Sequence, residues 1–349
     1  MSKAAFSCPL PDKRPDGRVS LALGEGGRVM RRWLRERLLP LLSCEPRGTQ
    51  HDAAWLPAGE SGLAFTTDSF VVSPLEFPGG DIGRLAVFGT VNDLAVSGAV
   101  PRWLSLSLIL EEGLPIDILD RVLSSIASAA QEADVEIVTG DTKVVPRGAA
   151  DSLFITTSGI GRLTPSPPPG PGALQPGDVL IVTGPVGRHG VAILSARESL
   201  AFEPAPESDC APLTPACVAL RTAGVTIRAM RDATRGGVAA VLHEYAEACG
   251  HAMWVDEKKL PPSDVVRGVS EVLGLDPLHL ACEGTMICAV PGEAADAAVI
   301  ALRTVDVSRQ AAAIGLVRPF EGTPVVVRRA LGREQALDEP TGAPLPRIC

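Results

Sequence analysis

The stretch Arg231-Asp232-Ala233-Thr234-Arg235-Gly236-Gly237 places one isolated acid and two glycines directly before a helix predicted over Val238–Ala248. Backbone N–H groups at the start of a helix can bind an anion such as phosphate. Upstream, an apolar strand expected at Val179–Thr183 leads through the turn Gly184–Gly187 into another helix that includes His189. This succession of strand, glycine turn and helix predicts an α/β domain.

The same alternation extends in both directions along the chain. Upstream, we expect strands at Ala53–Leu56, Leu63–Val72, Trp103–Leu110, Val135–Val138 and Leu153–Ile160, and helices at Val29–Leu39, Arg84–Ala99 and Pro115–Ala133. Downstream, we expect helices at Thr214–Ala223, Val265–Leu273 and Ala294–Leu302, and strands at Thr285–Val290, Ile314–Val317 and Val325–Val327.

Length and composition predict two domains, because 349 residues with 46% hydrophobic content can bury a large core. The expected segments are a disordered lead-in at 1–20, an amino-terminal domain at 21–163, a Pro/Gly-rich linker at 164–176, a carboxyl-terminal α/β domain at 177–335 and a mobile tail at 336–349.

The net charge, the hydrophobic runs and the cysteine positions exclude several classes of protein. The net charge of −9 comes without a basic block, so nucleic acid is not an expected partner. No apolar run is long enough for a membrane span or a signal peptide, which predicts a cytoplasmic protein. The eight cysteines include no CxxC pair, so neither a zinc site nor a disulfide framework is indicated.

Four aspartates stand alone in apolar surroundings on separate segments: Asp52, Asp68, Asp93 and Asp232. Each could simply cap or turn the chain, but hard divalent cations need several such oxygens that converge from different segments. Asp93 follows Asn92 inside an otherwise apolar helix, where an unpaired carboxylate is costly. A metal ion would satisfy that carboxylate.

Three further groups have both a structural and a chemical interpretation. Thr139-Gly140-Asp141-Thr142-Lys143 follows a predicted strand, at the carboxyl end where ligands commonly bind, although Lys143 by itself could be a solvated surface lysine. Gly24-Glu25-Gly26-Gly27 precedes a helix and is either a turn or an anion site. Glu283, before Gly284, is either a turn acid or a general base.

The chain ends on Cys349, behind residues rich in proline, glycine and charge. At about 3.3 Å per residue, the last 14 residues could sweep roughly 45 Å, which suits a carrier arm. Prenylation would need a cysteine where Pro346 stands, so a lipid anchor is not indicated. From its position alone, a stray thiol in a frayed terminus remains an open alternative.

Taken together, these motifs resemble the HypE family of [NiFe]-hydrogenase maturation proteins. The motifs are Gly24–Gly27, Thr67-Asp68-Ser69, Phe77-Pro78-Gly79-Gly80, Asn92-Asp93, Leu110–Pro115, Gly140–Lys143, Asp232–Gly237, Glu283-Gly284 and Pro346-Arg347-Ile348-Cys349. The resemblance implies a two-domain PurM-like fold, α/β (α+β) in class, whose amino-terminal sheets pair into a barrel in a homodimer. It also implies that ATP binds in a cleft beside that barrel.

The family's activity implies roles for individual residues. HypF would load a carbamoyl group on Cys349, the chain would use ATP to dehydrate that group to a thiocyanate, and the cyanide would pass to iron on HypC–HypD. Mg²⁺ would lie on Asp52, Asp68, Asp93 and Asp232, and protons would be handled by Lys143 and Glu283. The nucleotide would contact Gly26, Gly27, Asn92, Asp141, Thr142, Gly236 and Gly237.

The sequence departs from the family's pattern at two places. Leu23 replaces a histidine often found before the glycine loop, and Arg188 replaces an acid in Gly187-Arg188-His189-Gly190, so His189 is not assigned to the site. Two alternatives stay open: an ATP enzyme of the same superfamily that acts on a free small molecule, and a carrier that is carbamoylated without catalysing dehydration. Residues 21–30 hold no cysteine, which disfavours selenophosphate synthesis.

Overall fold

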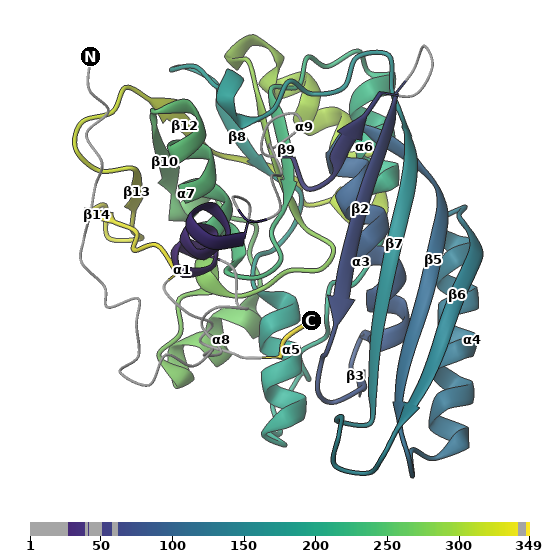
Figure 1. Cartoon of the computed structure of the whole chain (residues 1–349). Coiled ribbons are helices and arrows are strands. Elements are labelled where there is room, and N and C mark those ends of the chain that lie inside the picture. The colour runs from purple at the N-terminus through teal and green to yellow at the C-terminus, as the bar shows by residue number, and fades with distance from the viewer. Residues whose placement is uncertain (1–26, 39–40, 42–50, 58–61, 341–346) are drawn as a thin grey trace.

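The computed structural model describes residues 27–38, 41, 51–57, 62–340 and 347–349. These residues form two α/β halves, each built on its own sheet (Figure 1). The predicted lead-in 1–20, the loop residues Gly24, Glu25 and Gly26, and tail residues 341–346 lie outside the described part of the chain.

The first half contains one five-stranded sheet and two long helices. Its elements are β1 (Ala54–Leu56), β2 (Leu63–Phe70), β3 (Glu76–Phe77), β4 (Gly80–Asp81), α3 (Ile82–Val96), β5 (Ala99–Glu111), α4 (Ile116–Glu132), β6 (Glu136–Val145) and β7 (Leu153–Leu163). They are preceded in the chain by α1 (Gly27–Trp33) and the π-helical turn η2 (Leu34–Leu38), which form ion pairs with the second half through Arg31 and Arg35. The strand order is β1-β2-β7-β5-β6. Only β5 and β6 run parallel, because α4 crosses over between them.

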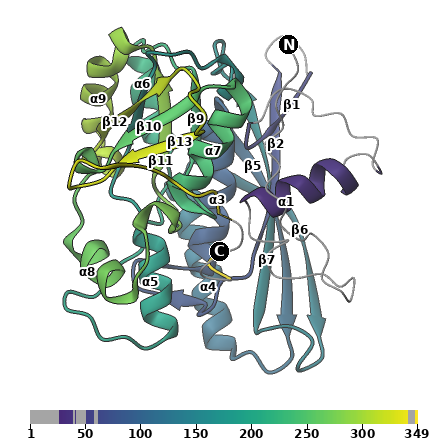
Figure 2. The ribbon, with the colours of Figure 1, turned by 90° about the vertical axis from the view of Figure 1, so that its left-hand side faces the viewer.

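One face of this sheet carries the helices and the other is open. Along β2 and β7, buried and more exposed residues alternate, as expected when only one face is packed. Helices α3 and α4 lie on the same side of the sheet (Figure 2). On the open side, the side chains of Phe65, Trp103 and Ile109 are 38%, 41% and 40% exposed.

The second half is a seven-stranded sheet with flanking helices. Its elements are β8 (Val179–Val182), α5 (Arg188–Arg197), α6 (Thr214–Thr222), β9 (Ala229–Asp232), α7 (Gly237–Cys249), β10 (Ala252–Asp256), α8 (Asp264–Leu273), β11 (Met286–Val290), α9 (Ala295–Arg303), β12 (Ala312–Arg318), β13 (Val325–Arg328) and β14 (Glu334–Ala336). The strand order is β14-β13-β10-β12-β8-β11-β9. The central strands are apolar, so that part of the sheet is buried between helices.

Helix α3 is the element that joins the two halves. It starts at Asp81, whose side chain accepts hydrogen bonds from the N–H groups of Gly83 and Arg84 at 2.7 and 3.1 Å. Nearly all of its residues are buried, because it packs on β2 and β7 on one side and on α6 and β9 on the other. A helix buried all round carries its polar residues, Asn92 and Asp93, into the junction.

The predicted alternation of strands and helices is confirmed, with one correction that matters for function. The strand expected at Val135–Val138 runs from Glu136 to Val145, so Thr139–Lys143 lies within an edge strand rather than beyond its carboxyl end. The sequence pattern also missed β9, β10 and the short β14. None of the helices in the described part of the chain has the length and apolar character that a membrane crossing requires.

Candidate active site

Three of the four predicted metal-binding aspartates meet at the junction between the halves. Asp52 precedes β1, Asp93 lies on α3 and Asp232 ends β9. One carboxylate oxygen from each lies within 4.8 Å of the other two. Three distant segments therefore converge here, and the role of their carboxylates as metal ligands stays a prediction.

The electrostatics of these three carboxylates reflect their burial and their proximity. Burial, followed by the charge of Asp52, raises the pKa of Asp232 to about 8. Burial raises the pKa of Asp52 to about 6, although Arg231 opposes this at 2.8 Å. The pKa of Asp93 is raised well above its usual range by burial and then by the neighbouring aspartates. Like charges this close cannot all ionise without a counter-charge.

The donor set fits a hard divalent cation. All three ligand groups are carboxylates, which suit Mg²⁺. The Oδ2 atom of Asp52 is buried and finds no hydrogen-bond partner among the described residues, so one oxygen is left for an ion. Asp93 is oriented by Thr66, whose hydroxyl donates to Oδ2 at 2.7 Å. A bound cation would replace the protons that burial otherwise forces onto the cluster.

Asp68 lies next to this cluster on β2. Its charge raises the pKa values of Asp93, Asp232 and Glu283, so it faces the same space. Its own pKa is raised by burial, while the charge of Arg235 lowers it. Asp68 thus lies near the three converging carboxylates, but it is not one of the residues whose oxygens lie within 4.8 Å of one another.

Glu283 is a buried acid, and one of its two carboxylate oxygens has no hydrogen-bond partner among the described residues. Its side chain is 3% exposed, and the unpartnered atom is Oε1. Burial, then Asp232, Asp209 and Asp68, raise its pKa well above the usual range. A carboxyl group in such surroundings is a candidate for proton transfer.

The backbone at Glu283 is held by Asp209, which the sequence did not single out. One oxygen of Asp209 accepts from the N–H of Glu283 at 3.1 Å. The other accepts from the N–H of Gly284 at 3.2 Å and from the hydroxyl of Thr285 at 2.9 Å. No local pattern could have revealed this, because 74 positions separate Asp209 from Glu283.

Asn92, a predicted nucleotide contact, is occupied by structural hydrogen bonds. Its side-chain amide donates to the carbonyls of Ala211 at 3.1 Å and Glu283 at 3.4 Å, and its oxygen accepts from the N–H of Leu213 at 2.7 Å. It is 1% exposed. These contacts fasten α3 to the second half, and a role in binding nucleotide stays a prediction.

The glycines before α7 are required by the backbone. Gly236 and Gly237 have φ angles of 80° and 60°, where side chains are strained. A Cβ at Gly237 would lie 2.5 Å from the carbonyl oxygen of Leu280. A Cβ at Gly27, with φ of 68°, would lie 2.4 Å from the carbonyl oxygen of Pro340, and one at Gly236 would also touch Pro340. Both glycine segments therefore meet the start of the tail, and their phosphate-binding role stays a prediction.

The start of the tail is fastened to α1 and to two histidines. Arg28 and Arg31 form ion pairs with Glu339. The Nε2 atoms of His243 and His279 lie 2.9 and 3.0 Å from the carbonyl oxygens of Leu337 and Asp338. Residues up to 340 are thus held in place by the second half and by α1.

The end of the tail is also docked. The N–H of Val71 donates to the carboxylate of Cys349 at 3.0 Å, and the N–H of Ser73 donates to the carbonyl of Arg347 at 3.4 Å. Ile348 is 4% exposed, and Cys349 packs on the same apolar cluster as Cys210 and Ala281. Figure 1 shows this end of the chain beside α5, between the two halves.

Asp141, Thr142 and Lys143 do not join this junction. Lys143 and Asp141 form an ion pair at 2.8 Å in which both side chains are more than half exposed. The hydrogen bond from Lys143 lowers the pKa of Asp141. The expectation of a strand-end site is wrong, because the edge strand continues through these residues.

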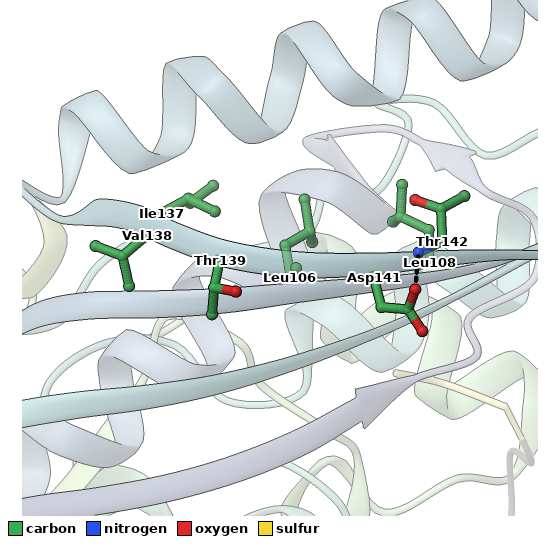
Figure 3. Close-up of a pocket in the computed structure, with 8 residues that line it drawn as sticks. Leu106, Leu108, Ile137, Val138, Thr139, Asp141 and Thr142 are labelled. Carbon is green, nitrogen blue, oxygen red and sulfur yellow. Dashed lines mark hydrogen bonds between the residues drawn. The ribbon is translucent and has the colours of Figure 1, made fainter.

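Asp141 and Thr142 border a shallow depression of about 520 Å³ on β5 and β6 (Figure 3). Its lining is Leu106, Leu108, Ile137, Val138, Thr139, Gly140, Asp141 and Thr142. The cross-strand register runs from Asp68 through Thr157 and Leu106 to Gly140. Three strand spacings, roughly 14 Å, therefore separate β2 from β6.

The whole chain has recognisable relatives. The family models for the N-terminal and C-terminal domains of AIR synthase related proteins match residues 50–163 and 175–326. A curated relative from Escherichia coli strain K12, carbamoyl dehydratase HypE, is 46% identical over 336 residues, 95% of this chain and 99% of its own. The predicted two-domain, PurM-like fold is thus confirmed.

Two solved structures are similar over most of the chain. One, the hydrogenase maturation protein HypE in complex with ATP, is 44% identical with a TM-score of 0.80 and covers 94% of this chain and 99% of that one. The other, from a HypE–HypF complex, is 40% identical with a TM-score of 0.83 and covers 88% of this chain and 99% of that one.

Proposed function

The chain belongs to the HypE family of carbamoyl dehydratases of hydrogenase maturation, and from this premise we propose that it dehydrates an S-carbamoyl group on its own Cys349. The product is a thiocyanate that supplies cyanide to the iron of a [NiFe]-hydrogenase. The docked tail supports the proposal, because the chain's last residue packs against the apolar cluster that includes Ala281 and Cys210, which are close in sequence to Glu283 and Asp209. A free substrate would need no such arm.

The reaction balances with ATP as the dehydrating reagent. The carbonyl oxygen of the thiocarbamate attacks the γ-phosphorus, and ADP leaves. The C–O bond then breaks with release of phosphate, while nitrogen loses two protons and the C≡N bond forms. The net change is thiocarbamate plus ATP to thiocyanate, ADP, phosphate and one proton.

The chain's own residues have distinct tasks in this reaction. Glu283 takes a proton from the carbamoyl nitrogen, which suits an acid held in a buried site. A Mg²⁺ ion on Asp52, Asp93 and Asp232, with Asp68 beside them, would neutralise charge on the phosphates. Gly27, Gly236 and Gly237, with the preceding Gly26, are proposed as backbone contacts to the nucleotide, and Asn92 fastens α3 to the second half beside them.

Lys143 enters the proposal through a second copy of the chain. Within one protomer, Lys143 lies on the edge strand β6, three strand positions away from β2 and its Asp68. The open face offers Trp103, Phe65 and Ile109 to a partner. We assign Lys143, Asp141 and Thr142 to a homodimer interface in which the sheets pair into a barrel and each Lys143 serves the other protomer's site.

The proposed partners follow the order of the reaction. HypF would donate the carbamoyl group, and HypC–HypD would accept the cyanide in the cytoplasm. The similarity to a chain solved with HypF supports the first step.

Mass spectrometry of the carboxyl-terminal peptide tests the proposal. After incubation with HypF, a carbamoyl donor and ATP, we expect carbamoylation of Cys349 followed by loss of one water from the same residue. Omission of ATP from carbamoyl-loaded protein should leave the carbamoylated peptide. Nucleotide hydrolysis without any loss of water would contradict the proposal and favour a carrier.

A further inference from the structure

We propose that His189 is the residue that seats the carboxyl-terminal dipeptide, and that Ser208 and Asp209 connect this seat to Glu283. The inference rests on the proposed function and adds a positioning residue that the sequence motifs left out. If His189 has this role, the position of Glu283, the proposed proton acceptor, depends on whether Ile348 and Cys349 are docked.

His189 contacts the tail directly. Its Nε2 atom lies 2.7 Å from the carbonyl oxygen of Ile348, the residue before Cys349. Its Nδ1 atom lies 2.8 Å from the hydroxyl of Ser208. The ring is fully buried, and Phe77 packs edge-on against it with the centroids 5.4 Å apart. A buried imidazole needs both hydrogen bonds, so an empty seat would leave Nε2 without its protein partner.

The hydrogen-bond partners of the two ring nitrogens fix the tautomer of His189. A carbonyl oxygen only accepts, so Nε2 carries the proton that is donated to Ile348. Burial lowers the pKa of His189, which favours the neutral ring and makes Nδ1 an acceptor. The hydroxyl of Ser208 therefore donates to Nδ1, while its oxygen accepts from the N–H of Cys210 at 3.1 Å.

Ser208 has little freedom to move. Its N–H donates to the carbonyl of Pro78 at 2.9 Å. A Cβ at Gly79 would lie 2.6 Å from the carbonyl oxygen of Ser208, so the first half packs directly on this backbone. The orientation of Ser208 is thus set by the chain, and His189 takes its orientation from Ser208.

The next residue carries the connection to the proposed proton acceptor. Asp209 accepts hydrogen bonds from the N–H groups of Glu283 and Gly284 and from the hydroxyl of Thr285. A Cβ at Gly284 would lie 1.8 Å from the carbonyl oxygen of Asp209, which shows how closely the two segments pack. A shift of Ser208 would therefore displace the backbone of Glu283.

Two further contacts hold the main chain of residues 347–349. The N–H of Val71 donates to the carboxylate of Cys349. The guanidinium of Arg197 donates to the carbonyl of Arg347. Arg197 also donates to the carbonyl of Ser73 at 3.0 Å. These groups position the main chain, whereas His189 joins the tail to the segment that holds Glu283.

Two substitutions of His189 test its two hydrogen bonds separately, the one from Nε2 to Ile348 and the one from Nδ1 to Ser208. His189→Gln keeps an N–H donor near the position of Nε2, and His189→Asn keeps an acceptor near Nδ1 but cannot reach Ile348. His251→Asn serves as a control, because that histidine is only half-buried and lies outside the site. Thermal melting checks that each variant is folded.

The first measurement is the rate at which iodoacetamide labels Cys349 in uncarbamoylated protein, read from the carboxyl-terminal peptide. Loss of one buried hydrogen bond should expose the thiol more often, so we expect about tenfold faster labelling in His189→Asn. His189→Gln and His251→Asn should stay near the wild-type rate. Equal labelling in the Asn, Gln and wild-type proteins would overturn the seat.

The second measurement is single-turnover dehydration of carbamoyl-loaded protein at saturating ATP. We expect about a tenfold loss in His189→Asn, which loses the contact to Ile348, and a comparable loss in His189→Gln, which keeps that contact but loses the one to Ser208; ATP affinity should be unchanged in both. If His189→Asn does not fold, Ser208→Ala takes its place, and faster labelling with slower dehydration is again expected. Wild-type rates in Ser208→Ala would overturn the connection to Glu283. Failure of the wild-type chain to dehydrate would instead contradict the proposed function.

Discussion

Two acidic groups in this chain resemble each other as sequence motifs and differ as structures. Asp52, Asp93 and Asp232 come from three distant segments, converge within 4.8 Å and have raised pKa values. Asp141 lies beside Lys143 on an edge strand, is exposed and has a lowered pKa. The comparison teaches that convergence at the junction of two halves, rather than a compact local motif, creates the unusual electrostatics.

The largest effect is expected at Glu283, the buried acid that the junction holds beside the aspartates. Glu283→Gln keeps the shape of the side chain and removes its ability to accept a proton. We expect dehydration of carbamoyl-loaded protein to slow about 10²–10⁴-fold, with carbamoylation and ATP binding retained. Single-turnover mass spectrometry measures the rate. A wild-type rate would remove Glu283 from the proton transfer.

Asp232→Asn should reduce ATP-dependent turnover by about 10²-fold or more, because the variant loses one of three converging ligands. Asp134→Asn is the matched control, since that aspartate is almost fully exposed. The Mg²⁺ dependence of turnover should weaken only in the Asp232 variant. Identical dependence in both variants would show that the cation binds elsewhere.

Substitution of Lys143 tests whether this exposed residue contributes to the buried Glu283 site of the other protomer in a dimer. Lys143→Ala and Glu283→Gln chains should each be defective alone. If Lys143 serves the partner's site, mixed dimers contain one intact site, so co-refolded chains should recover roughly a quarter of the wild-type activity. Recovery after mixing is the measurement. A mixture as inactive as either parent would place both residues' roles within one chain.

The smallest effect concerns stability without divalent cation. The pKa of Asp232 is about 8 in the folded chain and 3.8 for an aspartate exposed to water, so the folded state binds more protons and its stability falls as pH rises between these values. Asp232→Asn should therefore melt above wild type at pH 8, by about 1–2 °C for each kcal/mol of relieved repulsion in a chain of this length. The difference should shrink toward pH 4 and on addition of Mg²⁺. A variant that melts below wild type at pH 8 would argue against repulsion.

The sequence predicted the fold well where an apolar pattern marked each element. It failed at β6, because an edge strand exposed on both sides needs no apolar residues and Thr139–Lys143 looked like a loop. The strands β9 and β10 were missed because their sequences, Ala-Met-Arg-Asp and Ala-Met-Trp-Val-Asp, hold only one β-branched residue between them and both end on an acid.

The residues of the candidate site could be named from the sequence, whereas their arrangement could be anticipated only in part. Isolated acids in apolar surroundings correctly indicated convergence, since burial of a lone carboxylate is costly. The link through His189, Ser208 and Asp209 left no local signal, because its contacts to Ile348 and Glu283 join positions far apart in the chain.

The fastening of Glu339 and Pro340 limits how the carboxyl terminus can work. That point is held by α1 and by the glycine segments, and nine residues follow Pro340 in the chain. Nine residues at about 3.3 Å each give a working radius of roughly 30 Å around Pro340, shorter than the full tail would have. Under the proposed function, the protein that charges Cys349 and the one that receives its cargo would each have to present a reactive centre within that distance of Pro340, one after the other.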